Sequence, residues 1–114
     1  MKIDCTNAGT NTWDVQMTYN GLTFEQGVTY KISFDYSGTG KQPFSFHFMQ
    51  NYGSYLTFQT TNLTATDEVQ HYEATLTMEE ATESNARLGF DFGGDQMTVP
   101  FTVKIENLVL VKED

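Results

Sequence analysis

Residues 29–37, Thr-Tyr-Lys-Ile-Ser-Phe-Asp-Tyr-Ser, alternate between two kinds of side chain. The apolar row holds Tyr30, Ile32, Phe34 and Tyr36, and the polar row holds Lys31, Ser33 and Asp35. Successive side chains of a β-strand point to opposite faces, so this pattern predicts a strand with one face on a core.

The same period of two recurs along the chain, and no stretch shows convincing helical spacing. The runs are Lys2–Thr6, Trp13–Tyr19, Thr29–Ser37, Pro43–Gln50, Tyr55–Thr60, Val69–Met78, Ala86–Phe92 and Phe101–Val111. Asn20-Gly21 is typical of a turn between two strands, and residues 79–85 read as a charged loop. In the last run the parity slips near Glu106-Asn107, which predicts a β-bulge. Eight short runs in 114 residues predict one all-β domain over residues 1–114, an antiparallel jelly-roll β-sandwich.

Composition excludes several classes of function. Fifteen acidic against six basic residues give a formal charge of −9, which argues against a nucleic-acid partner. Cys5 is the one cysteine, so neither an internal disulfide nor a thiolate zinc site is expected. No apolar run reaches the length of a membrane span, so we expect no membrane partner, and we expect a monomer.

The outward rows of the predicted strands are not equivalent. Lys31 and its neighbours, and the row from His71 to Thr77, look like ordinary solvated sheet surface. Three other runs carry a different row, namely Gln16, Thr18, Ser45, His47, Met49, Arg87, Gly89 and Asp91. If those three strands are neighbours, their row supplies donors and acceptors suited to vicinal sugar hydroxyls.

Aromatic residues are expected at the margin of this face. Trp13 lies at the start of one run, and Asn51, Tyr52 and Tyr55 belong to the segment 50–55 beside another. Aromatic rings suit the apolar faces of sugar rings, although each of these rings could instead serve packing alone.

The residues predict no catalytic activity and leave two other kinds of function open. Glycoside hydrolysis usually needs two carboxylates that flank the bond, and only Asp91 falls on the predicted face, so we expect no enzyme. Arg87 and Asp91 could also form an ion pair of little consequence. A protein-binding or adhesive sandwich of a cell-surface protein, or a structural spacer, would use the same strands; unequal outward rows favour a sugar groove.

Several segments, in order along the chain, carry a family resemblance. They are Trp13-Asp14-Val15-Gln16, Asn20-Gly21-Leu22, Gly27–Phe34, Tyr52-Gly-Ser-Tyr55, Leu88–Gly93 and Val103–Leu110. Together they resemble family 4 and family 22-type carbohydrate-binding modules. The resemblance implies a non-catalytic jelly roll that grips internal stretches of a β-glucan, xyloglucan or xylan chain in an open groove. It also implies a covalently linked glycoside hydrolase and a secreted or cell-surface parent protein.

The resemblance places the family's contact positions on residues of this chain. They are the aromatics Trp13 and Tyr55, the polar residues Asn20 and Asn51, the strand residues Arg87 and Asp91, and Ser45 and His47. Gln16 joins this set from the alternation of its strand, and Tyr52 joins it from the segment 50–55 at the margin of the face. The family's structural calcium site uses an acid that corresponds to Glu106, together with a segment that would precede Met1. We therefore expect no cofactor, with calcium as the one alternative.

Overall fold

The structure, a computed structural model, describes residues 2–94, 97 and 99–113. These residues form eight strands and one short 3-10 turn, η1. Their bounds are β1 Lys2–Cys5, η1 Thr12–Asp14, β2 Gln16–Phe24, β3 Thr29–Gly38, β4 Gln42–Gln50, β5 Thr57–Ala65, β6 Gln70–Thr77, β7 Glu83–Asp91 and β8 Phe101–Glu113. No helix in this part of the chain is long and apolar enough to cross a membrane.

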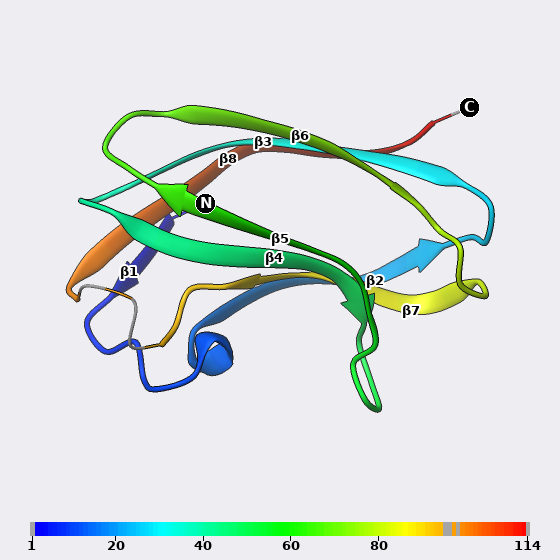
Figure 1. Cartoon of the computed structure of the whole chain (residues 1–114), viewed down its shortest axis with the longest axis horizontal. Coiled ribbons are helices and arrows are strands. Elements are labelled where there is room, and N and C mark those ends of the chain that lie inside the picture. The colour runs from blue at the N-terminus through cyan, green and yellow to red at the C-terminus, as the bar shows by residue number, and fades with distance from the viewer. Residues whose placement is uncertain (1, 95–96, 98, 114) are drawn as a thin grey trace.

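The strands form two four-stranded sheets, ordered β1-β8-β3-β6 and β2-β7-β4-β5, with antiparallel pairing throughout. Figure 1 shows the two sheets as layers, with β3, β6 and β8 in the upper one. This arrangement confirms the predicted β-sandwich. The predicted adjacency of the three strands with unusual outward rows is also confirmed, because β7 lies between β2 and β4.

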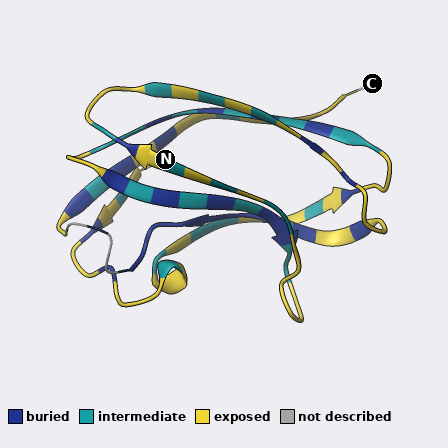
Figure 2. Cartoon of the chain, in the orientation of Figure 1, coloured by how far each residue is buried: buried dark blue, intermediate teal, exposed yellow. Residues whose placement is uncertain are grey.

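The core lies between the layers and is rich in phenylalanine. Figure 2 shows buried positions alternating with more exposed ones along the strands, as the period of two predicts. Phe34 of β3 packs edge-on against Phe46 of β4 and Phe90 of β7, with ring centroids 5.5 and 5.6 Å away. Aromatic pairs in this geometry gain energy beyond their buried area, so they join the two sheets firmly.

Two boundaries differ from the sequence prediction. Trp13 lies in η1 and not in a strand, because the Asp14 carboxylate accepts hydrogen bonds from the backbone N–H groups of Thr10 and Asn11, both at 2.9 Å. Such local side-chain bonds compete with strand pairing. Asn20-Gly21 does not end a strand but lies inside β2, where the register with β7 shifts.

The predicted bulge in the last strand is confirmed. Asn107 has a positive φ of 55°, and the register between β3 and β8 shifts between Ser33 and Asp35. Asparagine tolerates this left-handed backbone better than most residues. The bulge explains why Val103 and Leu108 lie on different parities of one strand.

Candidate functional site

The outer face of the β2-β7-β4-β5 sheet carries a cleft of about 690 Å³. Its lining residues are Thr12, Trp13, Gln16, Ser45, His47, Met49, Ser54, Tyr55, Thr57, Arg87 and Asp91. Strand register sets the order of the floor. Asp91 pairs with Gln16 and Ser45, Gly89 pairs with His47, and Arg87 pairs with Met49.

One wall of the cleft is η1, which presents Trp13 with 61% of its surface exposed. The backbone holds this turn against the end of β7, since Phe92 N–H donates to the Val15 carbonyl at 2.8 Å and Gly93 N–H to the Thr12 carbonyl at 2.9 Å. A Cβ at Gly93 would lie 2.7 Å from the Asn11 carbonyl oxygen, so only glycine permits this approach. The turn's position is therefore fixed by backbone contacts.

The opposite wall is the connection between β4 and β5, which presents Ser54 and Tyr55. Tyr55 is 46% exposed and has a positive φ of 53°. Its N–H donates to the Tyr52 carbonyl at 3.0 Å, and Gln50 N–H donates to the Leu56 carbonyl at 2.9 Å. Figure 1 shows η1 and this connection projecting from the same side of the sheet, away from the other layer.

A buried carboxylate, Glu83, anchors this second wall. It accepts hydrogen bonds from the Tyr52 hydroxyl at 2.5 Å, the Gln50 side-chain amide at 3.1 Å and the Asn85 backbone N–H at 3.1 Å. The Tyr52 hydrogen bond is the main reason that the pKa of Glu83 is lowered, and the same bond raises the pKa of Tyr52. Glu83 was not predicted from the sequence, since residues 79–85 were assigned to a loop although β7 begins at Glu83.

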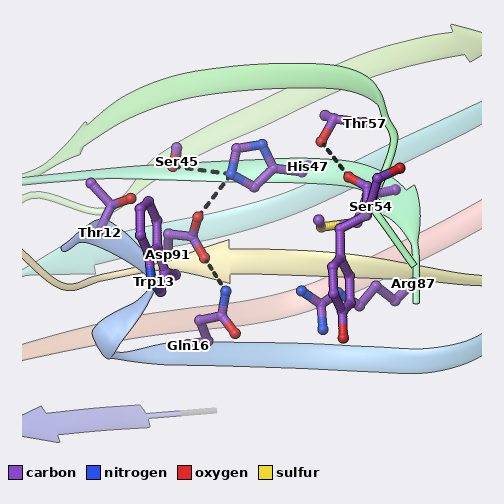
Figure 3. A pocket seen from close by; sticks show the side chains of 11 residues that line it. Thr12, Trp13, Gln16, Ser45, His47, Ser54, Thr57, Arg87 and Asp91 are labelled. Atoms are coloured by element: carbon purple, nitrogen blue, oxygen red, sulfur yellow. Dashed lines mark hydrogen bonds and ion pairs between the residues drawn. The ribbon is translucent and has the colours of Figure 1, made fainter. Parts of the chain in front are cut away.

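The floor contains a connected polar network around Asp91, which is only 7% exposed. One carboxylate oxygen accepts from the Gln16 side-chain amide at 2.9 Å, and the other lies 2.9 Å from His47 Nε2 (Figure 3). An ionised carboxylate only accepts hydrogen bonds, so Nε2 of a neutral His47 carries the proton and Nδ1 accepts from the Thr60 hydroxyl at 2.9 Å. The network fixes how these side chains face the cleft.

Arg87 lies at the other end of the floor, beneath the second wall. Its guanidinium carbon is 5.0 Å from the centroid of the Tyr55 ring, a cation–π arrangement, and its Nη1 donates to the Asn51 side-chain oxygen at 3.4 Å. Its buried Nε has no hydrogen-bond partner among the described residues. The ion pair between Arg87 and Asp91 that the sequence allowed does not form in this structure, because the Asp91 carboxylate is hydrogen-bonded to Gln16 and His47 instead.

The structure brings together most of the residues predicted from the sequence. Seven of them line the cleft, namely Trp13, Gln16, Ser45, His47, Tyr55, Arg87 and Asp91. Asn51 and Tyr52 support the lining through Arg87 and Glu83, and Asn20 is exposed at the register shift of β2 without lining the cleft. Thr12 and Thr57 were missed, and the sequence holds no pattern that separates them from other threonines.

The region of Glu106 does not fit a calcium ion. Glu106 is exposed on β8, and across the described residues no group of three or more acidic, histidine or cysteine side chains gathers in a way that could hold a metal. The carboxylate opposite it in the register, Asp35, is already hydrogen-bonded to His71 and Asn107.

The comparisons with known proteins agree with this geometry. A family model described as a carbohydrate binding domain matches residues 1–100. The chain belongs to this family. It is a carbohydrate-binding module of the family 4 type, with a non-catalytic, carbohydrate-binding role.

Three solved structures share the fold. A CBM4 structure matches with a TM-score of 0.88 and 20% identity, over 98% of this chain and 70% of the other. The N-terminal cellulose-binding domain of Cellulomonas fimi β-1,4-glucanase C matches with a TM-score of 0.79 and 20% identity, over 99% and 78%. The second N-terminal cellulose-binding domain of the same glucanase matches with a TM-score of 0.74 and 22% identity, over 100% and 76%. No curated protein matches the sequence.

Proposed function

We propose that this module binds internal stretches of a soluble or amorphous β-linked plant polysaccharide, of the β-glucan, xyloglucan or xylan class. The observation that carries the proposal is the pair of exposed aromatic walls, Trp13 and Tyr55, on either side of a polar floor. Aromatic faces suit the C–H faces of sugar rings, and amide, imidazole and hydroxyl groups suit their hydroxyls.

The layout of the walls supports an open groove. The walls stand beyond the two ends of the floor strands, so between them the floor runs from Asp91 to Arg87 along β7. The four steps from Arg87 to Asp91 cover roughly 13 Å at about 3.3 Å per residue, which suits one sugar chain and not a crystalline surface. The open sides lie over β2 and β5, so we propose that the chain crosses the strands and leaves the cleft at both sides.

We further propose that the module targets a covalently linked glycoside hydrolase to this polysaccharide outside the cell or at its surface, and that it acts as a monomer. Two of the similar structures are domains of a β-1,4-glucanase, which supports a linked hydrolase.

Affinity gel electrophoresis tests the proposed function. The panel holds mixed-linkage β-glucan, xyloglucan, xylan, glucomannan and laminarin. We expect retardation by one or two polymers, with dissociation constants between about 1 μM and 1 mM, because stacking and a few hydrogen bonds must offset the ordering of a flexible chain.

Two variants and a control assign the binding to the cleft. Trp13→Ala and Tyr55→Ala should abolish retardation while the unfolding temperature changes little, since both rings are exposed. Val109→Ala, on the outer face of the other sheet and 49% exposed, should retain it. No retardation of folded protein by any polymer would refute the function and favour a protein partner.

A further inference from the structure

The charge of Arg87 distinguishes it from the other basic residues of this acidic chain. It is the one arginine, and three of the five lysines, Lys2, Lys31 and Lys112, form ion pairs with carboxylates. Arg87 has no carboxylate within 4.0 Å among the described residues, although the chain has 15 acidic side chains. On the same strand, β7, the Asp91 carboxylate is hydrogen-bonded to His47 and the Glu83 carboxylate to Tyr52.

The guanidinium is nevertheless positioned by two contacts. The Tyr55 ring lies 5.0 Å from the guanidinium carbon, and Asn51 accepts one hydrogen bond from Nη1. Figure 3 shows the side chain of Arg87 lying along the floor with its guanidinium directed towards the space between the walls. A planar group with fixed donors loses little entropy when a ligand binds, and its fork matches the two oxygens of a carboxylate.

We propose that the cleft selects a polysaccharide that carries uronic acid side groups, and that Arg87 binds the carboxylate beside Tyr55. The inference rests on the proposed function, which it narrows from neutral β-linked chains to acidic, uronate-substituted ones such as a glucuronic-acid-bearing xylan. A neutral hydroxyl would occupy the same donors without using the charge that the cleft leaves unpaired.

The net negative charge of the protein limits how many uronic acid groups a bound polymer can carry. The formal charge of −9 repels a fully ionised polymer, but at physiological ionic strength exposed charges act only over a Debye length of about 8 Å. Among the residues that the structure describes, Asp91 is the only carboxylate that lines the cleft, and both of its oxygens are hydrogen-bonded. The cleft therefore suits a carboxylate that is isolated on a largely neutral backbone.

Titration calorimetry with a matched pair of polymers tests the proposal. One is a glucuronic-acid-substituted xylan, and the other is the same polymer after chemical reduction of its carboxyl groups to primary alcohols. We expect the wild type to bind the reduced polymer at least about tenfold more weakly, which corresponds to the loss of one charge-assisted hydrogen bond.

Variants test whether Arg87 causes the difference in affinity between the native and the reduced polymer. Arg87→Gln should bind both polymers with equal affinity, and Arg87→Lys, which keeps the charge without the fork, should recover part of the difference. Lys31→Gln, a charge change on the other sheet, should leave the difference intact.

Equal affinity of the wild type for the native and reduced polymers would overturn the inference, as would discrimination that survives in Arg87→Gln. Binding of neutral β-glucans with no binding of either xylan would also overturn it, while the proposed function would stand. Failure to bind any polysaccharide would instead refute the proposed function.

Discussion

Replacing Asp91 by asparagine tests whether the carboxylate orders the floor of the cleft. Asparagine has the same shape but one acceptor and one donor in place of two acceptors. Its oxygen can still accept from Gln16, and its amide must then donate to His47 Nε2. The imidazole proton would therefore move from Nε2 to Nδ1, where it is donated to the Thr60 hydroxyl.

The loss of stability expected for Asp91→Asn follows from the two hydrogen bonds that Asp91 accepts, each 2.9 Å long in the wild type. A bond to a charged group contributes about 1 kcal/mol more than a neutral one, so Asp91→Asn should lower the free energy of unfolding by about 2 kcal/mol. For a chain of this size that corresponds to a fall of roughly 8 °C in the unfolding temperature. Urea unfolding at pH 7 gives the free energy, and nitrogen-15 NMR of the imidazole gives the tautomer of His47.

The second histidine supplies a control. His71 Nδ1 lies 2.7 Å from the Asp35 carboxylate on the other sheet, where the His71 side chain is 55% exposed. Asp35→Asn makes the same chemical change in a pair that is more exposed than His47 and Asp91, so it should alter stability less. If Asp91→Asn unfolds within about 0.5 kcal/mol of the wild type and His47 keeps its tautomer, the carboxylate does not order the floor.

Two further predictions concern groups with displaced pKa values. Hydrogen bonds to Asp35 and Glu73 raise the pKa of His71 above its usual value, so the pair stabilises the fold fully below about pH 6.5 and less as the pH rises through the raised pKa. His71→Gln should remove that part of the pH dependence in chemical unfolding; an unchanged profile would contradict it. Chiefly because of the Tyr52 hydrogen bond, the pKa of Glu83 is lowered, so its contribution is present above about pH 4.3 and is lost as the pH falls through the lowered pKa. Glu83→Gln should reduce this acid sensitivity and speed amide hydrogen exchange at Tyr55, whereas exchange equal to the wild type would show that Glu83 does not hold the wall.

The parts of the fold that depend on alternation could be predicted from the sequence. The rows from Tyr30 to Tyr36 identify a strand and its buried face, and the parity slip before Leu108 locates the bulge that Asn107 makes. Alternation also predicted the residues of the cleft floor. They share an unusual outward row, and they lie together because their strands β2, β7 and β4 are neighbours.

The walls could not be predicted in the same way, because they depend on contacts between distant segments. Glu83 supports the β4–β5 connection through Tyr52, which is 31 positions away in the sequence. Trp13 lies outside its predicted strand because the nearby Asp14 carboxylate, in place of a strand partner, accepts hydrogen bonds from two backbone N–H groups. Such bonds are visible only when the geometry is known, since an acidic residue in a charged segment looks solvated in a sequence.

One strand, β4, shows how the chain separates folding from binding. Phe44, Phe46 and Phe48 point into the core and are at most 3% exposed, while the alternate residues Ser45 and His47 line the cleft. Both rows of side chains belong to the same strand, so the packing of the phenylalanines fixes the positions of the polar side chains between them. Substitutions at Ser45 or His47 should therefore change what the cleft recognises, whereas those at the phenylalanines should change whether the sheet exists at all. Because of this division, substitutions in the floor can change which ligand the cleft binds without altering the sandwich that supports it.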